Sequence, residues 1–441
     1  MITLVRLLRY TSYALLMTII LAAGLATYLA WLQPPFYFPK PTGQYAVGKR
    51  DYHWIDTTRK ETLSNDPAHP HRELMATIWY PAKGILPAQP TTPYIPYVAN
   101  YFKKNRPFFW LVSYARPAYT YAQPDASLAT NSTRYPIILY THGSGMGRAD
   151  SNTAHCEELA SHGYVVVGIS HPYESNIVQF PDGRIVVHDP AIAKKEGRSY
   201  LEVSGAEHKS LSFMEKREQL DGEYIERRIA DTQFVLDQLE LLNKNPDSIF
   251  FNRLALDDSG IFGQSFGSAT AMQLCRRDKR VKVCVGFDGS LFGPNAAEPL
   301  DKPVMFMLAG NTVAMFDNLT PRDRVRLNIS TPQEEQMVRD RFLLAFQKLM
   351  KGPDSYTFVV KDAGHIDFTD SALLKESSWL AGFLIRRVAT FPPGSINGLR
   401  ATKIVNDYLV NFFDQYLKDQ SSDLLDGRDT GYAEVERRYG K

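Results

Sequence analysis

The chain has 441 residues, enough for one large α/β domain with insertions or for two or three ordinary domains. Hydrophobic residues make up 44% and charged residues 22%, a composition typical of a packed globular protein and not of a disordered one. The formal net charge of +2 gives no electrostatic reason to expect a nucleic-acid partner, and we attribute basic pairs such as Arg227-Arg228 to solvated helix faces.

The N-terminal segment predicts a membrane or export helix. Arg6 and Arg9 precede an uncharged run from Tyr10 to Leu32, long enough to cross a hydrocarbon core of roughly 30 Å. The flanking arginines favour an N-terminus kept inside, so we expect a signal anchor or transmembrane helix over residues 1–33 and a periplasmic or extracellular catalytic domain. Secretion after cleavage is the alternative, because Gly24–Ala26 offers small residues for a signal peptidase.

Strand and helix patterns alternate through the rest of the chain, which predicts a mostly parallel central sheet with helices on both faces. We expect one hydrolase-like domain over residues 34–420, cap-like insertions near Tyr173–Gly222 and Asn311–Asp354, and a loose polar tail over residues 421–441. The predicted strands are Tyr45–Asp56, Arg72–Tyr80, Arg134–Tyr140, Tyr164–Ser170, Gly260–Phe262, Val281–Phe287, Val304–Leu308 and Tyr356–Val360; the predicted helices are Ser151–Ser161, Glu223–Asn243, Ala269–Arg276 and Ala401–Leu417.

A nucleophile pattern stands at the centre of the chain. The segment Gly263–Gly267 reads G-Q-S-F-G and lies after a short apolar run and before a helical one. Such a strand-to-helix turn lifts the Ser265 hydroxyl above a sheet, and the two glycines let the backbone make the turn. The setting predicts a serine hydrolase with an α/β-hydrolase fold.

Ser265 requires a general base, and the base requires an acid to orient it. His365 follows the last predicted strand and is the only histidine after Ser265, in the order that α/β-hydrolases use. For the acid, Asp288 follows its strand without a gap and is the first candidate, while Asp317 is the competitor.

An oxyanion needs two donors, and the sequence offers both. One is the backbone N–H of Phe266, directly after the nucleophile, and the other is the backbone N–H of Ser144 in the glycine-rich loop after the third strand. We interpret His142, in the same loop, as structural.

Cofactor and metal patterns are weak, so we predict neither. The loop at Gly143–Gly147 has alternating glycines but carries Arg148 where a dinucleotide fingerprint has its last glycine. His69 and His71 have no further ligand at zinc spacing. The three cysteines form no metal motif; Cys275 and Cys284 could pair in an oxidising compartment, although we favour ordinary buried thiols.

The motifs resemble those of a known family, the platelet-activating-factor acetylhydrolases of the plasma and type II class. The segment Gly263–Thr270 (GQSFGSAT) is similar to the family's G-H-S-F-G-G-A-T turn. The similarity extends to His142–Gly145, to Leu159–Tyr164, to Phe287–Gly289 and to the opening Gly43–Gly48.

The resemblance implies Ser265 as nucleophile, Asp288 as acid, His365 as base, and the N–H groups of Phe266 and Ser144 as oxyanion donors. Two neighbours depart from the family pattern: Gln264 replaces a histidine and Ser268 replaces a glycine. Both changes bear on the pocket and leave the catalytic groups in place.

These features predict a carboxylic-ester hydrolase, a lipase or esterase acting on a phospholipid acyl ester or a simpler ester through an acyl-enzyme. An acyltransferase using the same triad is the first alternative, and a non-catalytic binding protein on a hydrolase fold is the second. The aromatic stretch Pro93–Tyr121, which includes Phe108, Phe109 and Trp110, is either an interfacial or acyl-binding surface or ordinary packing. The sequence leaves the oligomeric state open.

Overall fold

The structure is a computed structural model. It describes residues 2–31, 35–105, 118–145, 147–188, 211–289, 291–326, 329–340, 344–377, 382–383, 385–386, 393–427 and 431–441.

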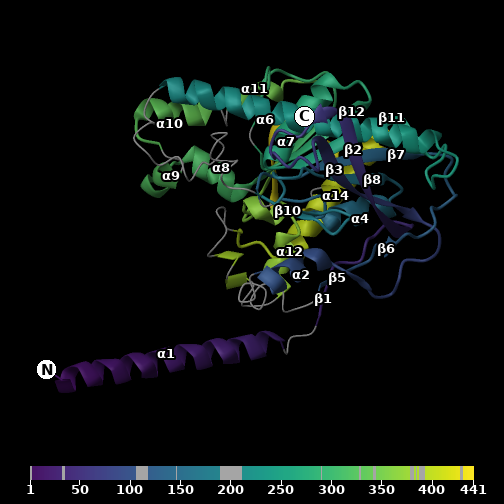
Figure 1. The fold of residues 1–441 in the computed structure, drawn as a ribbon. Helices are drawn as coiled ribbons and strands as arrows, with labels where there is room; N and C mark the ends of the chain where they lie inside the picture. The colour runs from purple at the N-terminus through teal and green to yellow at the C-terminus, as the bar shows by residue number, and fades with distance from the viewer. Residues whose placement is uncertain are drawn as a thin grey trace.

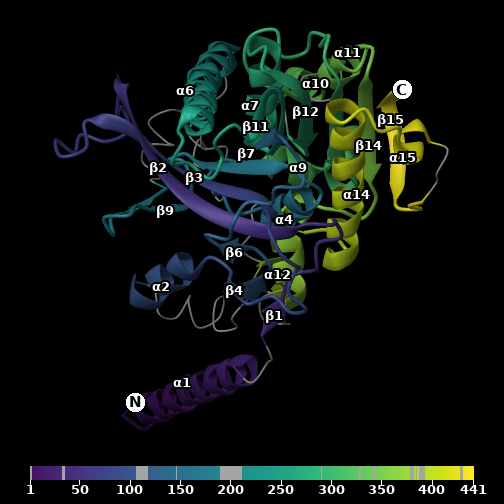
Figure 2. The same ribbon diagram turned by 90° about the vertical axis from the view of Figure 1, so that its right-hand side faces the viewer.

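A ten-stranded sheet forms the centre of the protein (Figures 1 and 2). From one edge to the other it contains β15 (Val435–Gly440), β14 (Ser355–Val360), β13 (Val304–Ala309), β12 (Val281–Phe287), β11 (Leu254–Gln264), β7 (Tyr135–Thr141), β8 (Val165–Ser170), β3 (His71–Ala82), β2 (Ala46–Lys60) and β6 (Gln123–Pro124). The strands from β14 to β8 pair in parallel, whereas β3 is antiparallel to both of its neighbours and β15 is antiparallel to β14. The predicted mostly parallel sheet is therefore confirmed.

Helices cover both faces of the sheet because its strands bury side chains in both directions. In β7, Ile137 and Leu139 join one apolar core with α6 (Leu211–Lys244) and α7 (Phe266–Arg277). The alternate positions, such as Ile138, face a second core with α4 (Thr153–Ser161) and α14 (Gly398–Leu417). Figure 2 shows α6 and α14 on opposite sides of the sheet.

The remaining elements are short and lie mostly outside this frame. They are β1 (Phe36–Tyr37), β4 (Thr92–Pro93), α2 (Pro96–Asn105), β5 (Ala118–Thr120), β9 (Ile177–Gln179), β10 (Ile185–Val187), α8 (Gly310–Asp317), α9 (Pro321–Arg326), α10 (Pro332–Arg339), α11 (Ala345–Leu349), the 3₁₀-helix η3 (His365–Phe368), α12 (Ser371–Ser377) and α15 (Asp423–Asp426). The expected insertion at Asn311–Asp354 is helical, from α8 to α11. In the insertion at Tyr173–Gly222, residues 189–210 lie outside the described part of the chain, as do Phe108, Phe109 and Trp110.

The predicted elements agree with the structure to within a few residues, except for two that begin earlier than predicted. Helix α6 begins at Leu211 instead of Glu223, within the predicted insertion. Strand β11 begins at Leu254 instead of Gly260, because Asp257 and Asp258 are exposed at a shift in the pairing with β7. A polar pair within a strand breaks the apolar pattern on which the prediction depends.

The C-terminal tail differs from the prediction. We expected a loose polar segment over residues 421–441, but β15 adds an edge strand to β14. Leu425, in α15, is fully buried in the core beside α14. Backbone hydrogen bonding to an open sheet edge does not require an apolar sequence. The apolar pattern therefore did not predict this charged strand.

The predicted N-terminal helix is present as α1 (Ile2–Trp31), and Figures 1 and 2 both show it standing away from the body. Its described apolar side chains are exposed, for example Leu21 at 64%. Among the residues that could be searched, which leave out parts of α1, no helix has the length and sustained apolar character needed to cross a membrane. The described part of α1 therefore does not support the expected membrane span.

The three cysteines are buried and free. The open question of a bond between Cys275 and Cys284 is settled in favour of two thiols, as small buried residues.

Candidate active site

Ser265 occupies a sharp turn between β11 and α7. Its backbone has φ 57° and ψ −120°, a combination that L-residues rarely adopt. The two flanking glycines allow the turn: a Cβ on Gly263 would lie 2.1 Å from the Gly267 carbonyl oxygen, and one on Gly267 would lie 2.0 Å from the Thr141 carbonyl oxygen. The predicted strand–turn–helix setting is confirmed.

Asp288 and His365 come together at the C-terminal ends of the parallel strands. Asp288 follows β12 and is buried, and its Oδ2 lies 2.7 Å from His365 Nδ1. The same carboxylate accepts the Ala309 N–H at 2.8 Å and the Thr312 hydroxyl at 2.7 Å. With Asp288 accepting, Nδ1 carries the imidazole proton and Nε2 is left as the basic nitrogen.

Asp317, the competing acid, lies elsewhere. Its carboxylate accepts from Arg438 Nη2 at 2.8 and 3.1 Å, so it joins the end of α8 to the C-terminal edge strand. The structure thus brings Asp288 and not Asp317 to His365.

The loop after β7 reaches Ser265 through Gly143. A Cβ on Gly143 would lie 3.1 Å from the Ser265 Cβ and 2.5 Å from Gln264 Oε1, so the loop backbone comes close to the serine turn at this glycine. Ser144 follows in the turn after this contact and is exposed. The loop that carries the Ser144 N–H therefore lies beside the serine.

Phe266 begins α7, where backbone N–H groups have no partner within the helix. Its ring is buried against Tyr224, with centroids 4.3 Å apart, and against Phe292 at 5.4 Å. These contacts anchor the start of the helix, and the helix dipole places partial positive charge at this end.

The two departures from the family pattern have visible consequences. Gln264 Nε2 lies 3.3 Å from His365 Nε2 and donates to the His365 carbonyl at 3.4 Å, so this side chain borders the base. Ser268 is fully buried, and its hydroxyl donates to the Gly263 carbonyl at 3.2 Å. A serine is therefore accommodated where helix and strand pack closely.

The prediction that Arg227-Arg228 belongs to a solvated helix face is wrong for Arg228. This side chain is fully buried in α6, and its Nε donates to Glu174 Oε2 at 3.2 Å. Its Nη2 donates to the Tyr224 hydroxyl at 2.8 Å, and its Nη1 donates to the His142 carbonyl. No local pattern marks one arginine of a pair as buried, since its partner Glu174 is distant in sequence.

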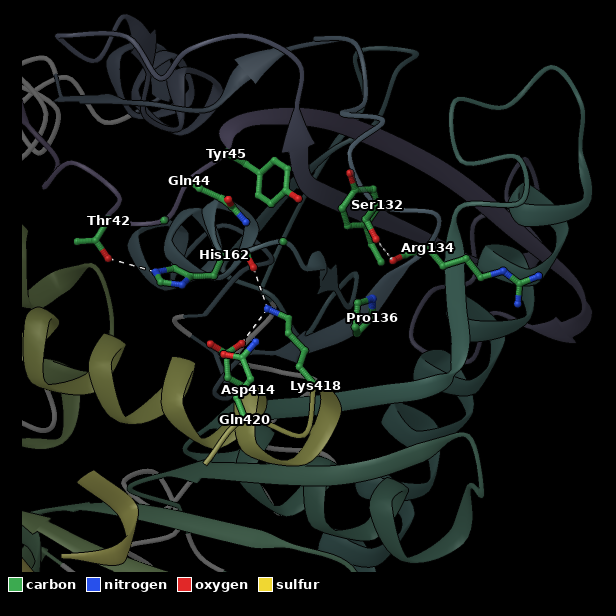
Figure 3. A pocket seen from close by; sticks show the side chains of 13 residues that line it. Thr42, Gln44, Tyr45, Ser132, Arg134, Pro136, His162, Asp414, Lys418 and Gln420 are labelled. Carbon is green, nitrogen blue, oxygen red and sulfur yellow. Dashed lines mark hydrogen bonds and ion pairs between the residues drawn. The ribbon is translucent and has the colours of Figure 1, made fainter. Parts of the chain in front are cut away.

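The described residues contain no group of three His, Cys, Asp or Glu side chains that could hold a metal ion. A hollow of about 590 Å³ lies near residues that precede β2, β7 and β8 (Figure 3). These are the opposite ends of the strands from Ser265. Lys418 in this hollow already donates to the His162 carbonyl at 2.8 Å and to Asp414 at 2.7 Å, so the hollow offers no free cation from this side chain.

Comparisons with known proteins identify the family. A family model described as platelet-activating factor acetylhydrolase, isoform II, matches residues 33–431. The chain belongs to this family. The predicted resemblance to this family is therefore confirmed.

Similar proteins include two mammalian platelet-activating factor acetylhydrolases and a fungal protein. The chain is 24% identical to the platelet-activating factor acetylhydrolase of Bos taurus, covering 78% of this chain and 76% of the relative. It is 23% identical to the platelet-activating factor acetylhydrolase of Cavia porcellus, and this match covers 67% of this chain and 62% of the relative. A protein of Arthroderma benhamiae named "Probable 1-alkyl-2-acetylglycerophosphocholine esterase" is 26% identical over 36% of this chain and 32% of the relative. The matches to the last two thus span less than two thirds of those relatives.

A solved structure shares the fold over almost its whole length. The ferulic acid esterase of Streptomyces cinnamoneus is 26% identical, with a TM-score of 0.67, and the match covers 91% of this chain and 99% of the esterase.

Proposed function

We propose that this protein is a serine-dependent carboxylic-ester hydrolase that acts through an acyl-enzyme. The observation that carries the proposal is the hydrogen bond between Asp288 and His365 at the C-terminal ends of the parallel strands. Ser265 lies at the same end of the sheet, in its strained turn. The family and the structural likeness to an esterase support the same activity.

Each residue has a distinct role in the proposed mechanism. Ser265 is the nucleophile, His365 is the general base through Nε2, and Asp288 orients the imidazole and stabilises its positive charge. The backbone N–H groups of Phe266 and Ser144 are the proposed oxyanion donors.

The reaction proceeds in two balanced halves. Ser265 Oγ attacks the ester carbonyl carbon while His365 Nε2 takes the hydroxyl proton, and the carbonyl oxygen becomes an oxyanion. Collapse of this intermediate expels the alcohol, which receives the proton from His365. Water then attacks the acyl-enzyme with His365 again as base, and the acid leaves as Ser265 regains its proton.

For the substrate, we propose an ester with a short or oxidised acyl chain on a phospholipid, or a simpler lipid-like ester. The names of the Arthroderma and mammalian relatives support a glycerophospholipid acetyl ester. The Streptomyces esterase, named for an aromatic acid, supports including aromatic acyl esters among the substrates tested.

Hydrolysis of nitrophenyl esters of graded acyl length tests the activity. We expect wild type to hydrolyse at least the short esters and Ser265→Ala to lose that activity, while Ser132→Ala, a remote serine at the hollow of Figure 3, retains it. Activity that survives in Ser265→Ala, or no activity on any chain length, would refute the proposal.

The same assay separates hydrolysis from the alternatives. With an added alcohol, a hydrolase releases mainly the free acid, whereas an acyltransferase releases mainly the new ester. A binding protein on this fold would release neither.

We further propose that α1 directs export and places the hydrolase domain outside the cytoplasm. Arg6 and Arg9 before the apolar run support this, as do the exposed apolar side chains of the helix. Fractionation of cells that express the full chain, followed by N-terminal sequencing, tests it; activity confined to the cytoplasmic fraction would contradict it.

A further inference from the structure

Buried side chains hold the loop that carries the Ser144 N–H. His142 is fully buried, and its Nδ1 lies 2.6 Å from the Gly143 carbonyl oxygen. A carbonyl oxygen can only accept, so Nδ1 must carry a proton and donate. This contact matters because the Gly143 carbonyl and the Ser144 N–H belong to one planar trans peptide, in which they point in opposite directions. Holding the carbonyl therefore aims the N–H.

Ser175 satisfies the other ring nitrogen of His142 in this tautomer. The Ser175 hydroxyl lies 2.7 Å from His142 Nε2, and its oxygen accepts the His171 N–H at 2.9 Å. With that N–H already directed at the oxygen, the hydroxyl proton is free to be given to Nε2. Burial, followed by the nearby positive charge of Arg228, lowers the pKa of His142 well below its usual value. The imidazole is thus neutral, with its one proton on Nδ1.

Arg228 holds the adjoining peptide. It donates to the His142 carbonyl, and its guanidinium carbon lies over the Phe266 ring, 5.7 Å from the ring centroid. The Arg228 side chain therefore contacts both parts of the proposed oxyanion hole. It bonds the His142–Gly143 peptide, which precedes the Ser144 donor, and it lies against Phe266, which carries the other donor. Glu174 pairs with the guanidinium, so the charge has a buried partner.

We propose that Ser175 and Arg228 are positioning residues of the oxyanion hole, acting through His142 on the Gly143–Ser144 peptide. The inference rests on the proposed ester hydrolysis and adds residues that set the direction of one donor. Without the Ser175 hydroxyl, the buried Nε2 lone pair of His142 loses its hydrogen-bond donor. The imidazole is then free to turn in its site, which withdraws the Nδ1 proton from the Gly143 carbonyl and lets that peptide rotate away from its present orientation.

The test compares a nitrophenyl ester with its thiono analogue, in which sulfur replaces the carbonyl oxygen. Sulfur is a weak acceptor, so thionoester hydrolysis depends less on the oxyanion donors. For Ser175→Ala we expect kcat on the oxo ester to fall roughly tenfold or more with KM little changed, and the oxo-to-thiono rate ratio to fall with it. Arg228→Lys keeps the charge but cannot donate to Glu174, Tyr224 and the His142 carbonyl together, so it should lower the same ratio.

Ser161→Ala is the matched control, because Ser161 is equally buried but bonds Glu158 and Gly43 away from the site. It should leave the ratio unchanged, and circular dichroism and urea unfolding establish that each variant is folded. An unchanged ratio in folded Ser175→Ala would overturn this inference while leaving the proposed function intact. Activity retained by Ser265→Ala would instead overturn the proposed function.

Discussion

Ser265 adopts a backbone conformation that its surroundings must maintain. A non-glycine residue at φ 57° and ψ −120° costs on the order of 1–3 kcal/mol, which the packing of β11 and α7 offsets. The Ser265 N–H donates to the Phe287 carbonyl at 2.8 Å, which ties the turn to the end of β12. The residue after Phe287 is Asp288, so one strand end supports both the nucleophile and the acid.

Asp288→Asn tests the orienting acid. An asparagine keeps the shape of the side chain, but its amide can donate to Nδ1 and so favour the tautomer that leaves Nε2 protonated. We expect kcat on nitrophenyl esters to fall by roughly three to four orders of magnitude with the fold intact. Asp317→Asn, which removes a charge paired with Arg438, should change kcat less than twofold. Equal losses in the two variants would contradict the assignment.

At the scale of elements, the site depends on how closely β7, β11 and α7 approach one another. A Cβ on Gly263 would overlap the backbone of α7 and one on Gly267 would overlap the end of β7, and the loop after β7 touches the turn through Gly143. The Ser265 region is therefore a packed junction of three elements, and a substitution in one element should displace the other two.

Gly267→Ala tests this junction. The added Cβ would lie 2.0 Å from the Thr141 carbonyl oxygen, so α7 or β7 must move. We expect the free energy of unfolding to fall by about 2 kcal/mol or more and activity to fall with it. Gly24→Ala is the control, because its Cβ would meet nothing within 4 Å. Urea unfolding of both variants would decide, and a Gly267→Ala protein as stable as wild type would refute the packing argument.

At the scale of the whole molecule, buried ionisable groups on α4 make stability depend on pH in two opposite ways. Burial lowers the pKa of His155 to about 4 and raises the pKa of Glu157 to about 7. Both groups favour their neutral forms in the folded state, so each is destabilised at the pH where it would charge.

For His155, the folded pKa lies below the unfolded value. The contribution of this side chain to the free energy of unfolding is therefore fully present above about pH 6.5 and is lost as the pH falls toward 4. The loss is on the order of 3 kcal/mol. We expect His155→Gln to be less stable than wild type at pH 7, and this deficit to shrink at pH 4.5. Urea unfolding at the two pH values measures it; a deficit that grows toward acid would contradict the prediction.

Glu157 should behave in the opposite sense. Its carboxyl accepts the N–H groups of Tyr121 and Ala122 at 3.1 and 2.7 Å, and its folded pKa is raised, so stability is lost as the pH rises from about 4.5 toward 7. The deficit of Glu157→Gln relative to wild type should therefore be smaller at pH 8 than at pH 4.5. The same unfolding series checks this, with His155→Gln as the variant of opposite slope.

Much of the architecture was predictable because strand and helix periodicity is a local property of the chain. Alternating apolar residues located the strands of the sheet to within a few residues, and the pattern at Gly263–Gly267 located the serine turn. The segments that escaped were those with mixed polarity, such as the first half of β11 and all of β15.

The sequence by itself determined which residues could serve as nucleophile, base and acid, and the order of the strands that carry them. Only the tertiary structure decided that Asp288 and not Asp317 reaches His365, that Arg228 is buried beneath the loop of Ser144, and that the charged tail completes the sheet. The physical reason is that periodicity reports which face of an element is buried. The identity of the partner depends on which strand ends and helices become neighbours after the sheet has formed.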